Sequence, residues 1–290
     1  MTQDGITVDW LLEARFGLDG GAMFGIIPRP LWTRTNPADD ANRIELGTRC
    51  MLIRHPYAGN ILVDVGLGTK WDAKSRKIYN IRPPTEPGPG GIEAALAARG
   101  LRVDDINHVI LTHLHFDHAG GVSRYAADGQ TVVATFPRAR HYLMRENWTW
   151  AHAPTERDAG SYRPIDFSLF DTDPNAPELV LLDGLTELFE GVTLIPRRGH
   201  TPGMACVLVK TPEDVFCYLA DLIPTAGHLR IPYVMGYDLD PAQSCREKRE
   251  LLAEAARHGW KLVFEHDPDT PWCRVEHDGH GQYRRIPEEA

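Results

Sequence analysis

The sequence predicts an α/β (α+β) sandwich, in which two similar β-rich halves face each other and helices lie on the outer faces. Two repeated patterns lead to this prediction. The segments NILVDVG and VFCYLAD each indicate a hydrophobic strand that ends in an aspartate, Asp64 or Asp221. The segments HVILTH and KLVFEH each indicate a strand that follows a helix and ends in a histidine, His113 or His266. Such a weak internal repeat is typical of a fold with two related halves.

Residues 1–48 are expected to form an N-terminal strand, Thr7–Leu12, followed by an apolar loop. Pro28 and Pro30 interrupt this loop, and proline removes a backbone donor and clashes with the preceding turn of a helix. We therefore expect no regular helix in the loop.

The next elements lead to the first repeated motif. Strands at 49–54 and 60–65 flank the turn HPYAG and are expected to form a hairpin. A helix over Gly91–Arg99 is expected to end at Gly100, since glycine commonly follows the last helical residue. The strand His108–Thr112 is apolar throughout, which indicates burial on both faces.

The middle of the chain, residues 138–190, is expected to be a surface insertion with a helix over Ala139–Trp150 and a polar connection. After it, short apolar runs predict strands at Val192–Pro196, Cys206–Lys210 and Val215–Ala220.

The last predicted elements are a helix over Pro241–Arg257, stopped by Gly259, and a strand over Lys261–His266. We treat residues 1–290 as a single domain, since this length suits one large core.

Composition excludes several classes of protein. The chain has 31 basic and 40 acidic residues and a net charge of −9, so we expect no nucleic-acid partner, because phosphate binding needs a basic face. No apolar run approaches the ~20 residues of a membrane helix, and we expect no membrane association. The N-terminus carries acids where a secretory signal has a basic cluster, so a cytoplasmic location is expected. Five cysteines without a CxxC pair indicate reduced thiols.

The thirteen histidines are the most informative part of the composition. Four potential metal ligands follow the strand at 108–112 within six residues: His113, His115, Asp117 and His118. In extended geometry His113 and His115 project to the same side, whereas Asp117 and His118 lie where the chain turns towards a helix. This donor set suits borderline cations such as Zn²⁺.

Three more residues stand at predicted strand ends. His200 follows the strand TLIP in the segment RRGHTPG, Asp221 follows FCYLA, and His266 follows KLVFE. Each could be a turn or capping residue when considered alone. Together, at successive strand ends, they complete a metal-binding set.

The run HLHFDHAGG, followed in order by GHTPG, LAD and FEH, resembles the metallo-β-lactamase superfamily over nearly the whole chain. The resemblance implies an αββα sandwich and two Zn²⁺ ions per chain, although manganese, iron or cobalt could occupy the same ligands. It implies one ion held by His113, His115 and His200. It implies a second held by Asp117, His118 and His266, with Asp221 bridging both.

This resemblance implies metal-assisted hydrolysis, in which a hydroxide that bridges the metals attacks a carbonyl. Asp117 and Asp221 are the expected catalytic residues, with Asp117 carrying a proton to the leaving group. Asp64 and Thr112 are candidates for orienting the metal-binding imidazoles. Asp64 could equally be a turn former at a strand end.

Absences narrow the choice within the superfamily. A cysteine in place of Asp221 is usual in the class B β-lactamases. Only 24 residues follow His266, so we expect neither the glutathione-binding domain of the glyoxalase II enzymes nor the flavin domain of the flavodiiron proteins. HLHFDHAGG and LDGGAMFGIIPRPLW resemble the YtnP-type quorum-quenching N-acyl-homoserine lactonases. The expected function is therefore lactone ring opening, with phosphotriester or aryl ester hydrolysis as the alternative. Several lactonases carry a tyrosine where this chain has Pro224, and Tyr233 or Tyr237 could substitute for it.

A small-molecule lactone or ester is the expected partner, and a homodimer remains open. The candidate substrate-binding residues are Met23, Phe24, Ile26, Phe116 and His228. The aromatic loop that contains the first three could instead be part of the core. Trp148 and Trp150 could likewise be helix packing or a pocket lid.

Overall fold

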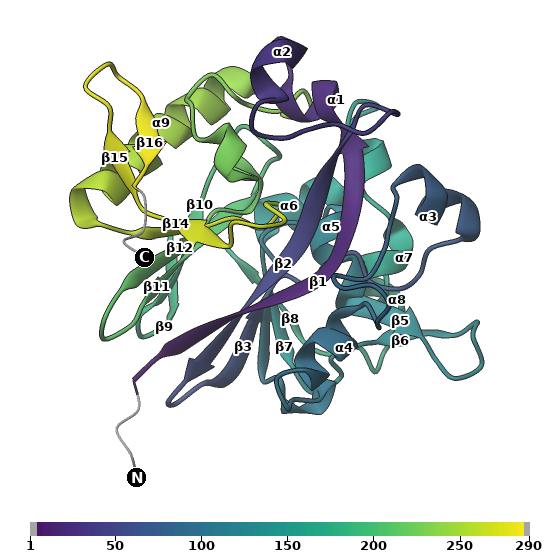
Figure 1. Ribbon diagram of the computed structural model, residues 1–290. Coiled ribbons are helices and arrows are strands. Elements are labelled where there is room, and N and C mark those ends of the chain that lie inside the picture. The colour runs from purple at the N-terminus through teal and green to yellow at the C-terminus, as the bar shows by residue number, and fades with distance from the viewer. Residues whose placement is uncertain (1–4, 287–290) are drawn as a thin grey trace.

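In the computed structural model, which describes residues 5–286, two six-stranded sheets pack face to face with helices outside them (Figure 1). The first sheet has the order β1-β2-β3-β4-β7-β8. Its strands are β1 (Thr7–Asp19), β2 (Arg43–His55), β3 (Gly59–Val63), β4 (His108–Ile110), β7 (Arg140–Met144) and β8 (Leu179–Leu182). The first three run antiparallel, and β3, β4, β7 and β8 run parallel to one another.

The second sheet has the order β14-β13-β12-β11-β10-β9. Its strands are β9 (Thr186–Phe189), β10 (Val192–Pro196), β11 (Ala205–Lys210), β12 (Val215–Tyr218), β13 (Lys261–Val263) and β14 (Trp272–Cys273). Neighbouring strands are antiparallel except β12 and β13, which are parallel. The fold is thus the predicted sandwich of two β-rich halves.

Side chains of the hairpin strands alternate between two cores. Met51 and Ile53 point between the sheets, where they join a core with residues of the second sheet. Cys50 and Leu52 point the other way, into the core beneath the helices of the first half. All four side chains are fully buried. Because both faces of β2 are covered here, the run Cys50–Ile53 is apolar without interruption, as buried strand segments are.

The helices cover the two outer faces. Those of the first half are α4 (Ile92–Ala97), α5 (Phe116–Ala119), α6 (Arg145–Ala151), α7 (Pro164–Phe167) and α8 (Leu169–Thr172). The second half is covered by α9 (Pro241–His258), which packs Leu251, Leu252 and Ala255 into the core of the second sheet. Asp240 caps its first turn by accepting from the N–H of Gln243, and Gly259 ends it in the left-handed conformation.

The predicted internal repeat corresponds to a repeated strand pairing. Strand β3 lies parallel to β4, and β12 lies parallel to β13. The first strand of each pair leads to an aspartate, Asp64 or Asp221, and the second leads to a histidine, His113 or His266. Equivalent strand ends of the two halves therefore carry equivalent residue types.

The N-terminal segment differs from the prediction. The first strand continues to Asp19, beyond the predicted end at Leu12, with a bulge between Leu12 and Ala14. The loop that follows contains two short helices, α1 (Gly20–Phe24) and α2 (Arg29–Trp32). Proline excludes a long helix there but not a single turn, because it is tolerated at the first helical positions.

The segment 138–190 also differs from the prediction. The expected helix over Ala139–Trp150 is wrong in its first half, which forms β7, and only Arg145–Ala151 is helical. The segment is not confined to the surface, because β7 and β8 extend the first sheet. The apolar run HYLM is buried between β4 and β8, and this burial outweighs its local preference for helix.

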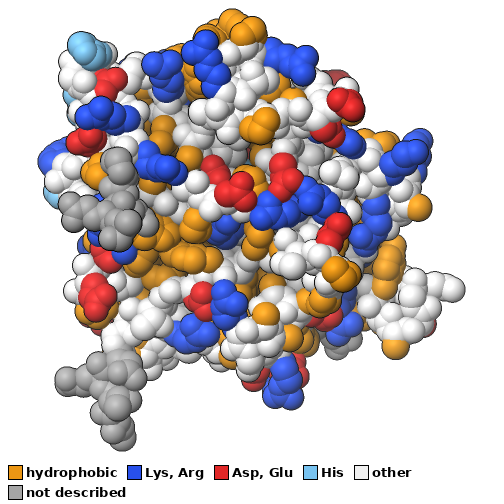
Figure 2. All heavy atoms as spheres, in the orientation of Figure 1, with side chains coloured by type: hydrophobic (Ala, Val, Ile, Leu, Met, Phe, Trp, Pro, Cys, Tyr) orange, Lys and Arg blue, Asp and Glu red, His pale blue; other side chains and the backbone are white. Residues whose placement is uncertain are grey.

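The remaining elements are peripheral. They are α3 (Ala73–Ile78), the hairpin of β5 (Ser123–Tyr125) and β6 (Val132–Ala134), and the hairpin of β15 (Val275–His277) and β16 (Tyr283–Arg285). Figure 2 shows one face of the molecule, on which basic side chains are interspersed with acidic ones. No helix among residues 5–286 combines the length and the apolar character that crossing a bilayer requires.

Candidate metal centre

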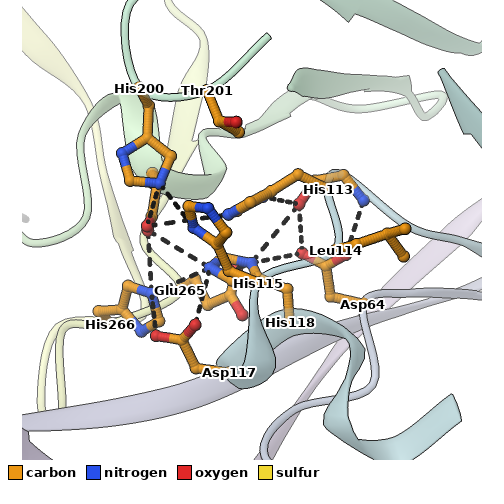
Figure 3. A network of polar contacts seen from close by, with 12 residues as sticks. Asp64, His113, Leu114, His115, Asp117, His118, His200, Thr201, Glu265 and His266 are labelled. Carbon is orange, nitrogen blue, oxygen red and sulfur yellow. Dashed lines mark hydrogen bonds and ion pairs between the residues drawn. The ribbon is translucent and has the colours of Figure 1, made fainter. Parts of the chain in front are cut away.

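The predicted ligands converge at one edge of the sandwich, where strands of both sheets end (Figure 3). After β4, the chain passes through His113 and His115 into the single-turn helix α5, which presents Asp117 and His118. From the second half come three residues, each directly after a strand or in the turn that follows it: His200, Asp221 and His266. All seven side chains are buried.

These side chains form two groups whose donor atoms lie within 4.8 Å of one another: His113, His115, His200 and Asp221 in the first, and Asp117, His118 and His266 in the second. The Asp221 carboxylate faces both groups. Its Oδ2 lies 3.0 Å from His200 Nε2 and 4.0 Å from His113 Nε2. Its Oδ1 lies 2.9 Å from His266 Nε2 and 3.5 Å from His118 Nε2.

Several of these donor atoms lack ordinary hydrogen-bond partners. The Nε2 atoms of His113 and His115 are buried without a partner, which is costly for a polar atom inside a protein. The Nε2 atoms of His118 and His266 lie only 3.3 Å apart. Imidazole nitrogens and carboxylate oxygens at this spacing suit divalent cations such as Zn²⁺. The residues present therefore fit divalent metal ions.

The electrostatics make Asp221 anionic and keep two of the imidazoles neutral. Burial alone would raise the pKa of Asp221, but the charges of His200 and His266 outweigh it and hold the pKa well below its usual range. Burial opposes charge on His200 and His266, yet Asp221 raises their pKa values to about 10 and about 9. Burial and neighbouring imidazoles lower the pKa values of His113 and His115 well below normal. Asp221 is thus anionic, whereas His113 and His115 are neutral.

Asp64 and Thr112 make the contacts expected of orienting residues. Asp64 Oδ2 lies 3.1 Å from Nδ1 of His118 and fixes the orientation of that ring. The backbone N–H and the hydroxyl of Thr112 each donate to Asp64 over 2.8 Å. Asp64 has a φ of 54°, a left-handed conformation that is uncommon for a residue other than glycine. The strand end is therefore bent to aim this carboxylate at the site.

Two further carboxylates contact the site and were not predicted. Glu265 Oε2 lies 2.8 Å from His118 Nδ1, and burial raises the pKa of Glu265 to about 8. Asp238 Oδ1 lies 3.0 Å from His200 Nδ1. Glu265 directly precedes His266, which could have drawn attention to it. Asp238 stands in a loop 38 residues from its partner and carries no sequence signal.

The glycines of HLHFDHAGG are explained by close backbone packing. A Cβ at Gly120 would lie 2.1 Å from the carbonyl oxygen of Leu67. A Cβ at Gly121 would lie 2.2 Å from the carbonyl oxygen of Val65. Only glycine lets the segment after α5 lie against the loop that follows β3.

A cavity of about 250 Å³ opens onto the site. Five of the seven predicted ligands line it: His115, Asp117, His200, Asp221 and His266. Its other walls are mixed apolar and polar side chains, namely Leu18, Met23, Tyr79, Phe116, Arg157, Ser161, Met235 and Tyr237, together with Gly160. A small molecule in the cavity would therefore contact the candidate ligands directly.

Of the candidate substrate-binding residues, Met23 and Phe116 line this cavity, whereas Phe24, Ile26 and His228 do not. Phe24 is fully buried and stacks on the His228 ring with centroids 4.0 Å apart. His228 Nε2 contacts the carbonyl oxygen of Met23 over 2.9 Å, and burial lowers the pKa of His228 to about 3. Ile26 is 92% exposed on the surface. Packing of the aromatic loop into its own core explains the positions of Phe24 and His228, whereas Ile26 lies on the exposed side of the loop.

Of the remaining aromatic candidates, one lines the cavity and the others pack in the cores. Tyr237 lines the cavity, and burial raises its pKa to about 12. Tyr233 lies outside the cavity, in the core beneath α1 and α2. Trp148 and Trp150 pack against the core of the first half. Arg157 and Ser161, which line the cavity, were not predicted, because they lie in an irregular loop without a motif.

Comparison with known proteins identifies similar sequences. Residues 43–266 match the sequence profile of the Metallo-beta-lactamase superfamily. The N-acyl homoserine lactonase AttM of Agrobacterium fabrum is 26% identical over 243 residues, which cover 80% of this chain and 86% of the lactonase.

Solved structures show the same architecture. A probable metal-dependent hydrolase from Staphylococcus aureus has a TM-score of 0.84 and 27% identity, with 100% of both chains covered. AidC, described as a dizinc quorum-quenching lactonase, has a TM-score of 0.77 and 18% identity, with 100% of this chain and 97% of AidC covered. At the latter identity the likeness shows the fold alone.

Proposed function

We infer the function from one established premise: the chain belongs to the metallo-β-lactamase superfamily and is a hydrolase. We propose that it hydrolyses the ester bond of N-acyl-homoserine lactones with the help of two Zn²⁺ ions. The similarity to AttM, named an N-acyl homoserine lactonase, supports the substrate class. The reaction adds water to the ring carbonyl, breaks the ring C–O bond, and yields a carboxylate and an alcohol.

The observation that carries the proposal is the two-sided contact of Asp221 with the His200 side and the His266 side of the site. We assign Asp221 as the bridging ligand. The other ligands divide as the two groups do: His113, His115 and His200 for one ion, and Asp117, His118 and His266 for the other. Two divalent cations held there would polarise the ester carbonyl and lower the pKa of water.

Asp117 is the proposed proton carrier. It lines the cavity, and its two carboxylate oxygens lie 3.7 Å from His266 Nε2 and 3.8 Å from His118 Nε2. A carboxylate in this position can take the proton from water and deliver it to the ring oxygen that departs. Met23, Phe116 and Met235 give the cavity apolar walls that suit an acyl chain.

A lactone panel combined with metal analysis tests the proposal. Purified protein should open short- and long-chain N-acyl-homoserine lactones in a pH-stat assay and contain about two zinc ions per chain. Metal-free protein is the control. Faster turnover of phosphotriesters or aryl esters than of any lactone would replace the proposal with the alternative substrate class. Protein that binds metal but turns over none of these substrates would contradict it outright.

A further inference from the structure

One cationic side chain stands apart in the wall of the cavity, where it is also exposed to solvent. Among the described residues that line it, Arg157 is the only lysine or arginine. It lies on the loop between α6 and α7, outside the set of metal-binding candidates.

The guanidinium of Arg157 uses only some of its hydrogen-bond donors within the protein. Its Nη2 donates to the carbonyl oxygens of Gly236 and, over 3.4 Å, Asp238. These carbonyls belong to the loop that brings Met235 and Tyr237 to the cavity wall. Within residues 5–286, Nε and Nη1 of Arg157 have no hydrogen-bond or ion-pair partner. Since a guanidinium has five N–H donors, most remain free for a ligand.

The loop that carries Arg157 is held in place by hydrogen bonds of the residues next to it. The adjacent Asp158 is buried and accepts a hydrogen bond from Trp150 Nε1 over 2.6 Å. At the end of the loop, the hydroxyls of Tyr162 and Thr201 lie 2.7 Å apart. This contact ties the loop to the residue that follows His200. A donor positioned in this way loses little freedom when it binds a ligand.

We propose that Arg157 determines substrate specificity. Its guanidinium would donate a hydrogen bond to the carbonyl oxygen of the amide group that joins the acyl chain to the lactone ring. This inference rests on the proposed function. An ester at the metal-binding side chains leaves the amide as the next polar group, and an unpaired carbonyl within the apolar walls would be costly. Ser161 and Tyr237 offer neutral hydroxyls in the same cavity, but a charged donor binds a carbonyl more strongly. The preferred substrates are thus lactones with an acceptor oxygen beyond the ring.

Two matched substrates test this role: N-butanoyl-homoserine lactone, and a γ-butyrolactone with an alkyl chain that lacks the amide. For Arg157→Met, we expect kcat/KM for the amide substrate to fall ~10- to 100-fold, mainly through KM. The same variant should change the alkyl lactone less than about twofold. Arg157→Lys should recover part of the loss, because it restores a charged donor. Arg145→Met is the control, since Arg145 pairs with Asp183 and does not line the cavity.

The outcomes separate this inference from the proposed function. Equal losses on both lactones would mean that Arg157 only secures the loop at 235–238, and would overturn the specificity role. Unchanged kinetics on both would overturn it as well. Wild-type protein that opens neither lactone would overturn the proposed function and, with it, this inference. If Arg157→Met does not fold, Arg157→Gln, which keeps an N–H donor for the loop carbonyls, gives the same comparison.

Discussion

The contact between Asp238 and His200 permits a quantitative test of how the metal site is supported. Both side chains are almost fully buried, and Asp238 Oδ1 lies 3.0 Å from His200 Nδ1. Asp238→Ala would leave a buried imidazole N–H without an acceptor, which costs about 1–3 kcal/mol. Asp238→Asn would keep an acceptor and the side-chain shape but remove the charge that makes the imidazole more basic.

Loss of such an outer partner typically weakens metal binding by about 10- to 100-fold. We expect Asp238→Ala to fall in this range, equivalent to about 1.4–2.8 kcal/mol. Asp238→Asn should lose about 10-fold at most, because only the charge is gone. The affinity for the ion assigned to His200 should fall, whereas the affinity for the other ion should not change.

The assay is a titration of metal-free protein with zinc against a competing chelator at neutral pH. Asp214→Asn is the control, because Asp214 forms an ion pair with Lys261 over 2.7 Å and contacts none of the proposed ligands. Wild-type zinc affinity in both Asp238 variants would refute the reasoning. An equal loss of both metal equivalents would refute the assignment of His200 to one ion.

Four further predictions follow from the same structure. Asp221→Ala should lower the content of both metals, whereas His266→Ala should lower chiefly one, as metal analysis can measure. Gly120→Ala should destabilise the fold by about 3 kcal/mol in denaturant unfolding, because its Cβ would meet a backbone oxygen at 2.1 Å. Gly160→Ala, with open space around its Cβ, should change stability little. Burial raises the pKa of Glu13 from 4.5 to about 7, so its contribution to stability is full below pH 4.5 and is lost as pH rises through 7. The free energy of unfolding of Glu13→Gln, relative to that of the wild type, should therefore rise by about 3 kcal/mol between pH 4.5 and a pH above 7. Removal of metal by a chelator should abolish hydrolysis and lower the melting temperature, and added zinc should restore both.

Each of these predictions has a contradicting result. Two retained metals in Asp221→Ala would remove the bridging assignment. Equal stability of Gly120→Ala and Gly160→Ala would mean that the backbone relaxes freely after α5. A pH-independent difference between wild type and Glu13→Gln would mean that Glu13 titrates normally. Full activity after complete metal removal would exclude a metal-dependent reaction.

The elements that could be predicted are those whose boundaries are marked by residues within or next to the element itself. Strand β10 has the predicted bounds, Val192–Pro196, because a short apolar run is bounded by turn residues. The helix α9 matches within one residue, since Asp240 and Gly259 mark both of its ends. The dense run from His113 to His118 indicated a metal site because its residue types and spacing are themselves the chemical signal.

Features that depend on long-range packing could not be predicted. The segment 140–144 is a strand only because β4 and β8 flank it, and neither neighbour is near in sequence. Asp238 reaches His200 across a loop, and Arg157 reaches the cavity from an irregular segment. His228 had the residue type of a site residue, yet its contacts are with the aromatic loop.

The site lies where the two halves of the chain meet, a boundary that we call the seam. Binding of the metal pair therefore depends on assembly of the whole fold. Four candidate ligands precede residue 120 and three follow residue 199, and the carboxylate that faces both groups belongs to the later set. Strand β2 also crosses the seam, where the N–H of Gly47 donates to the carbonyl of His266 over 3.0 Å. A fragment ending near residue 190 would carry the dense histidine motif without the bridging carboxylate. Tight binding of a metal pair would therefore report that both halves have docked.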